Sequence, residues 1–116
     1  MKNDPRYAPW LTIADELVGL HEFVYGPNGP FAHIKDSPFQ LTGLDAAAWI
    51  RNKCAEGRWY WWDKTSLSGK AKDPLRSFDH VIGDGSGKYE KTEAGREMIA
   101  RIEVLAARID DISNRA

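Results

Sequence analysis

The C-terminal part of the chain carries its most regular apolar pattern. Between residues 93 and 113, apolar side chains recur at alternating steps of four and three, which places them along one stripe of an α-helix. This spacing predicts a helix over about 93–113. The stripe consists of Met98, Ile102, Leu105, Ile109 and Ile112. We favour a helix that packs on its own domain, and the alternative is a short coiled-coil seam in a homodimer, flanked by Arg101, Arg108 and Arg115.

A second apolar stripe lies near the N-terminus. Its residues are spaced by three or four, and prolines stand just ahead of them, where a missing N–H costs nothing. The stripe consists of Trp10, Ile13, Leu17, Leu20 and Val24. It predicts an amphipathic helix over about 9–23, which the Gly- and Pro-rich residues 25–30 end.

The middle of the chain predicts a mixture of elements. Residues 31–39 lack periodicity and are expected to form a loop, whereas Thr42 and Asp45 have the form of a capping box ahead of a helix that ends at Gly57. The aromatic run 59–62 predicts a strand, and the Ser-, Gly- and Lys-rich residues 65–74 predict an exposed loop. Residues 77–82 and 88–92 flank an Asp-Gly tip at 83–87, which predicts a β-hairpin.

The length supports one domain. A chain of 116 residues and 13.1 kDa has room for one core, so we expect a single globular domain over 1–116. The expected fold class is α+β, with three helices and a two- or three-stranded antiparallel sheet.

The charge is unevenly distributed along the chain. The formal net charge is −1, but residues 1–50 hold three basic and six acidic residues, whereas residues 51–76 hold seven basic and three acidic ones. This balance excludes a uniformly basic nucleic-acid binder and leaves room for a local basic surface. The basic segment also contains Trp59, Tyr60, Trp61 and Trp62.

Three interpretations of this basic, aromatic segment stay open. The aromatic run can be core beside a solvated loop, or the segment can form a protein-binding face or a nucleic-acid face. We favour a contact surface for a protein or nucleoprotein partner. Its candidate residues are Arg51, Arg58, Trp59, Trp61, Trp62, Lys64, Lys70, Lys72 and Arg76.

No motif in the sequence indicates catalysis, a cofactor or a metal. The glycine-rich stretch before Lys88 lacks the first glycine and the hydroxyl residue of a phosphate-binding loop. His21, His33 and His80 have no metal-ligand spacing, and Cys54 has the position of a small core residue. We therefore expect a protein that is not an enzyme.

Two further features bear on where such a chain would be found. A single cysteine suits a reducing compartment, because it cannot form an intramolecular disulfide. The longest apolar runs are far too short to span a membrane. The expected location is the cytoplasm, without membrane contact.

Tyr89, Thr92, Gly95 and Arg96 follow a glycine-rich turn, and in this order they resemble the segment that joins the last wing strand to the final helix in winged-helix regulators of the MarR and PadR kind. The resemblance implies a wing at 83–88, dimerisation through the C-terminal helix and DNA binding. The helix at 44–56, which would be the recognition helix, departs from that pattern because its cations come late.

Two functional hypotheses follow. The first is a non-enzymatic interaction module that binds a protein or nucleoprotein partner through the basic, Trp-rich surface, in the manner of a phage or mobile-element inhibitor of a host complex. The alternative is a winged-helix-like, DNA-binding transcriptional regulator.

Overall fold

Helices form the regular secondary structure of the chain. The structure is a computed structural model that describes residues 4–32, 38–83 and 85–115, with the backbone alone for residues 38–42 and 81. Its α-helices in these ranges are α1 (Ala8–Tyr25), α2 (Pro38–Ala55), α3 (Asp63–Ile82) and α4 (Glu93–Ser113). Short 3-10 helices, η1 (Pro5–Tyr7) and η2 (Tyr89–Lys91), precede α1 and α4.

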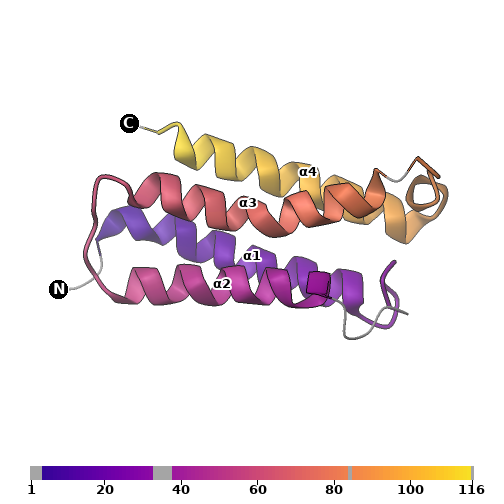
Figure 1. The fold of residues 1–116 in the computed structure, drawn as a ribbon, viewed down its shortest axis with the longest axis horizontal. Helices are drawn as coiled ribbons and strands as arrows, with labels where there is room; N and C mark the ends of the chain where they lie inside the picture. Colours follow the sequence, from indigo (N-terminus) through magenta and orange to yellow (C-terminus); the bar gives the residue numbers. More distant parts are fainter. Residues whose placement is uncertain (1–3, 33–37, 84, 116) are drawn as a thin grey trace.

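Successive helices run in opposite directions (Figure 1). Helix α1 packs on α2 and α4, and α3 packs on the same two helices, which is the arrangement of an up-down-up-down bundle. The connection from α2 to α3 therefore lies at the same end of the bundle as the start of α1 and the end of α4 (Figure 1). Three segments that are far apart in the sequence meet at this end.

The predicted apolar stripes of the first and last helices are confirmed as core. All five stripe residues of each helix are buried, and α4 spans the range expected for it. At the far end of the bundle the core is aromatic, because the ring of Phe31 lies 5.8 Å from Phe78 and 5.3 Å from Tyr89.

Helix α2 begins earlier than the sequence indicated. It starts at Pro38, so the capping box expected at Thr42 and Asp45 is wrong, and both residues lie inside the helix. Its buried residues Ala46, Ala47, Ile50 and Cys54 recur every three or four positions, which holds one face of the helix against the core. The predicted end is nearly correct, because the helix stops at Ala55 and Gly57 follows with a φ of 75°.

Helix α3 replaces both the loop predicted at 65–74 and the strand predicted at 77–82. Composition favoured a loop, yet Leu67, Ala71, Leu75 and Phe78 recur every three or four residues and are all buried. Burying this face stabilises the helix by more than the interior Pro74 destabilises it, since a proline inside a helix costs about 3 kcal/mol and each large apolar side chain contributes roughly 1.5–3 kcal/mol.

The predicted β-hairpin is wrong. Residues 77–82 are the end of α3, and the reversal that follows uses Gly85 and Gly87, with φ of 88° and 67°. The chain then enters η2 instead of a second strand. An Asp-Gly dipeptide signals a reversal of the chain, and here that reversal joins two helices.

The residues behind the winged-helix resemblance build the start of α4. Thr92 caps the helix, accepting a 3.0 Å hydrogen bond from the Gly95 N–H. Gly95 lies so close to buried Tyr89 that an added Cβ would stand 1.9 Å from its carbonyl oxygen. Arg96 donates a 2.9 Å hydrogen bond to the carbonyl oxygen of Glu90. The residues of the motif therefore form one tightly packed helix start, and they do not follow a wing strand.

The expected α+β fold is wrong. Residues 4–32, 38–83 and 85–115 contain four α-helices and no strand, so the antiparallel sheet and the winged-helix likeness are both overturned. The aromatic run 59–62, predicted as a strand, is an irregular turn. Without a wing or a sheet, the structural basis for a winged-helix regulator is lost.

Candidate functional site

The connection between α2 and α3 exposes tryptophan to solvent. Residues 57–62 of this connection are called the aromatic turn below. Trp61 is 86% exposed and Trp62 is 44% exposed, whereas Trp59 and Tyr60 are half-buried. A largely exposed indole is unusual on a folded domain, because burying apolar surface is the main favourable contribution to folding.

A buried carboxylate fixes the shape of the aromatic turn. Asp63, at the start of α3, is completely buried, and its Oδ2 accepts a 2.7 Å hydrogen bond from the Tyr60 N–H. The Asp63 N–H donates back to the Tyr60 carbonyl oxygen at 3.0 Å. Lys53 of α2 approaches from the other side, with its Nζ 3.3 Å from Asp63 Oδ1 and 3.1 Å from a Glu56 oxygen. These two carboxylates, Glu56 first, raise the pKa of Lys53 and keep it charged.

A second contact ties the aromatic turn to the N-terminus. The Tyr7 hydroxyl of η1 donates a hydrogen bond to the Arg58 carbonyl oxygen, and the Tyr7 ring meets the Trp59 ring edge-on at 5.2 Å. The Arg6 guanidinium lies over the Trp59 ring, 4.9 Å from its centroid. The turn is therefore held by contacts from α2, α3 and η1.

The aromatic rings point to two sides of the bundle end. Tyr60 and Trp62 stack face to face, with centroids 4.7 Å apart and planes 3° from parallel, beside a hollow of about 250 Å³ that Trp49 also lines. Trp61 touches this pair with one edge, at 5.5 Å from Trp62. Trp59 lies on the other side, towards η1. Trp61 therefore keeps most of its surface free of contacts from the described residues.

An apolar groove of about 500 Å³ lies beside Trp61 and is called the Trp61 groove below. Its walls come from η1, the first turn of α1, the aromatic turn, the start of α3 and the end of α4. Three of its lining residues are cations and none is a carboxylate. The lining residues are Pro5, Arg6, Pro9, Trp10, Trp59, Trp61, Lys64, Ile112 and Arg115.

The structure brings some of the expected contact residues together. Trp59, Trp61 and Lys64 line the Trp61 groove, with Arg58 on the same turn. Lys64 also lines a neighbouring polar hollow of about 270 Å³ between α3 and α4, together with Lys72 and Arg76. Lys64 is the residue that the two hollows share.

Several of the expected cations are engaged elsewhere. Arg51 pairs with Asp15 of α1 at 2.7 Å, Lys72 pairs with Asp110 of α4 at 2.5 Å, and Arg76 pairs with Asp73 at 3.3 Å. Lys70 lies over the Trp49 ring, 5.8 Å from its centroid. The nine residues therefore do not form one continuous basic patch, and carboxylates offset much of their charge.

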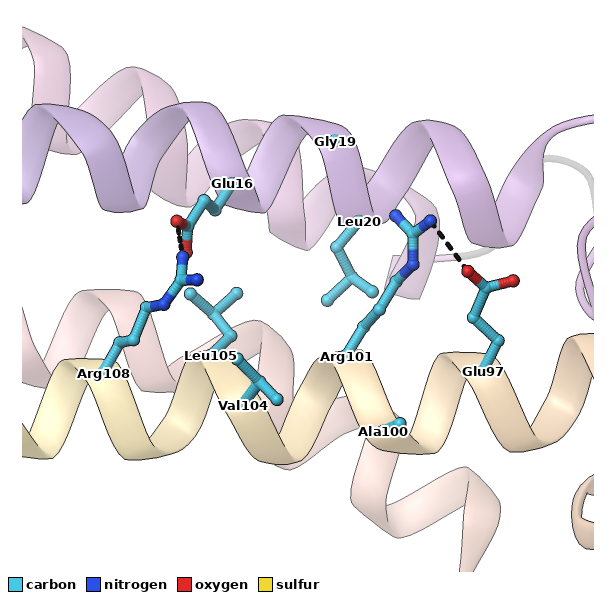
Figure 2. Close-up of a pocket in the computed structure, with 9 residues that line it drawn as sticks. All are labelled: Glu16, Gly19, Leu20, Glu97, Ala100, Arg101, Val104, Leu105 and Arg108. Carbon is cyan, nitrogen blue, oxygen red and sulfur yellow. Dashed lines mark hydrogen bonds and ion pairs between the residues drawn. The ribbon is translucent and has the colours of Figure 1, made fainter.

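The proposed dimer seam of α4 faces the interior of this chain. Met98, Ile102, Leu105, Ile109 and Ile112 are all buried against the other helices. The outer side of α4 instead forms a groove with α1 of about 540 Å³, where Leu20 and Leu105 make the floor and Val104 is 53% exposed (Figure 2). Ion pairs Glu16–Arg108 and Glu97–Arg101 stand along it (Figure 2).

Cys54 and the three histidines are the residues that the sequence offered as a possible nucleophile and as possible metal ligands. Burial raises the pKa of the Cys54 thiol to about 11, so it is protonated at neutral pH. His21 is half-buried and its burial lowers its pKa, His80 is exposed, and His33 lies outside the described residues. Within the ranges that the structure describes, no group of three or more His, Cys, Asp or Glu side chains could hold a metal ion.

Six of the nine residues that line the Trp61 groove were not among the expected contact residues, and four of them carry large or charged side chains. Arg6, Trp10, Ile112 and Arg115 come from the two ends of the chain, about fifty residues from the aromatic turn. Arg115 stood out only as a flank of the possible coiled-coil seam. No spacing rule links such distant positions, because only the helix packing brings them together.

None of the helices described is long and apolar enough to cross a membrane. Comparisons with protein-family models, with curated proteins and with solved structures found no match.

Proposed function

We propose that this chain is a non-enzymatic binding module that contacts a protein partner, alone or within a nucleoprotein complex, through the aromatic turn. The observation that carries this proposal is the 86% exposure of Trp61 on a turn that a buried carboxylate holds in place. Tryptophan, tyrosine and arginine dominate the binding energy of protein interfaces. All three residue types gather at this end of the bundle.

The rigidity of the aromatic turn supports the same proposal. Asp63, Lys53 and Tyr7 fix its backbone before any partner arrives. A contact surface that is already ordered loses little conformational entropy on binding, which leaves more of the contact energy for affinity. A turn that served only to connect two helices would not need this number of anchors.

The experiment is an affinity capture with two matched variants. The protein is immobilised, a nuclease-treated lysate of the source organism is passed over it, and retained proteins are identified by mass spectrometry. Trp61→Ala removes the exposed indole, and Val104→Ala, which removes an exposed apolar side chain from the α1–α4 groove, is the control. Both positions are exposed, so neither change should alter the thermal midpoint by more than a degree or two.

The proposal expects one protein to be retained by the unchanged chain and by Val104→Ala, and to be lost with Trp61→Ala. Truncating a central tryptophan costs about 2 kcal/mol or more, which is roughly a thirtyfold loss of affinity. Equal capture by both variants, or no capture that depends on Trp61, would contradict the proposal.

A further inference from the structure

The Trp61 groove has the properties of a preformed receptor for a side chain. Its volume of about 500 Å³ falls within the range of ligand pockets, roughly 300–1,000 Å³. The walls carry Trp10, Trp59 and Trp61, which are rigid rings, and two prolines, whose backbone is fixed. Such walls suit an apolar side chain and need little rearrangement to receive it.

The rim of the groove selects for negative charge. Lys64 donates a 2.6 Å hydrogen bond to the Arg115 carbonyl oxygen and has no carboxylate partner in the part of the chain described. Arg6 and Arg115 are paired with Asp4 and Asp111, at 2.5 and 3.0 Å, but these carboxylates do not line the groove. Each guanidinium has five N–H donors, so both arginines keep donors for another anion.

A nucleic acid fits this surface less well than a protein. Carboxylates lie beside Lys72, Arg76 and Arg115, so the positive charge along α3 and α4 is interrupted. The rings also form no series of open stacking platforms, because Tyr60 and Trp62 cover each other and Arg6 covers one face of Trp59. Binding to single strands relies on such open platforms and on an uninterrupted positive track.

From these observations we infer that the Trp61 groove receives a segment of the partner protein in which an aromatic or large aliphatic side chain is flanked by carboxylates. This inference rests on the proposed protein-binding function. The apolar side chain would lie between Trp59 and Trp61, above the buried ring of Trp10, and the carboxylates would meet Lys64 first and then the two rim arginines. Charge complementarity at the rim thus gives the groove its specificity.

The test uses the purified full chain and two synthetic peptides in isothermal titration calorimetry. One peptide has a central phenylalanine with two aspartates before it and two aspartates after it. The other peptide has asparagines in place of these aspartates. The aspartate peptide should bind about tenfold more tightly, since each partly exposed ion pair contributes up to about fivefold. A thymidine oligonucleotide is the third probe.

Two charge reversals locate the effect. Lys64→Glu should remove most of the preference for the aspartate peptide, whereas Lys91→Glu, which changes an exposed lysine of η2 at the opposite end of the bundle, should leave it unchanged. The inference is overturned if the two peptides bind equally, if neither binds at about 1 mM, if the preference survives Lys64→Glu, or if the oligonucleotide binds more tightly than either peptide. Any of these results together with Trp61-dependent protein capture would remove the inference about the groove and leave the proposed function standing.

Discussion

Replacing Asp63 by alanine should destabilise the protein by about 3 kcal/mol. The change removes the acceptor of a 2.7 Å hydrogen bond from the Tyr60 N–H, and a charged acceptor is worth roughly 1.5–3 kcal/mol. It also removes the favourable position of a carboxylate in the first turn of α3, worth about 0.3–1 kcal/mol. Lys53 is 14% exposed and keeps Glu56 as a partner, so the loss stays below that of a fully broken buried ion pair, about 3–5 kcal/mol.

Two further variants separate the contributions at this position. Asp63→Asn keeps an oxygen acceptor of the same size and loses the charge, so it should cost about 1–2 kcal/mol. Asp73→Ala, on the exposed side of the same helix, removes a carboxylate that pairs only with Arg76, and should cost less than about 1 kcal/mol.

Urea denaturation followed by circular dichroism measures all three changes. A loss of about 3 kcal/mol also corresponds to a drop of roughly 10–15 °C in the thermal midpoint of a chain of this size. If Asp63→Ala cost no more than Asp73→Ala, the buried carboxylate would not hold the aromatic turn, and the reasoning on its rigidity would fail.

Other predictions concern the helices and the buried titratable groups. Gly69→Ala should raise the free energy of unfolding by about 1 kcal/mol, because an added Cβ meets no atom within 4 Å. Gly95→Ala should lower the free energy of unfolding by at least about 1 kcal/mol, because its Cβ would collide with the Tyr89 carbonyl oxygen. Urea denaturation measures both changes. Cys54 should react with a thiol reagent at pH 7 only as fast as the protein opens, and rapid labelling without denaturant would contradict its burial and its pKa of about 11. Burial lowers the pKa of His21 below 6.5, so this histidine is protonated in the unfolded chain at a higher pH than in the folded protein. The free energy of unfolding should therefore fall as the pH drops below 6.5. In urea melts at several pH values, His21→Gln should make the free energy of unfolding depend less on pH in this range.

Local sequence signals determined the elements with the most regular apolar pattern. The stripes of α1 and α4 were predicted correctly because five apolar positions in each fall on one face. The proline before α1 and the glycine after α2 marked ends close to those observed. At these positions the local and the tertiary preferences agree.

Helix α3 shows where local signals failed. Its Ser, Gly, Lys and Pro residues favour a loop when each is weighed by itself, and the buried series at Leu67, Ala71, Leu75 and Phe78 becomes decisive only when the other helices are there to cover it. For the same reason, residues 77–82 at the end of this helix were wrongly predicted to be a strand of a β-hairpin. The four residues that resemble the wing-to-helix segment of winged-helix regulators instead form the capped start of α4.

For the candidate site, the sequence by itself determined that tryptophans and cations are concentrated between residues 51 and 76, and that their charge is local. Only the tertiary structure decided which of them face solvent together, because Trp61 gains its groove from residues near both chain ends, Arg6 and Arg115 among them. The physical reason is that composition fixes the chemistry available to a surface, whereas the packing of antiparallel helices fixes which distant side chains share it.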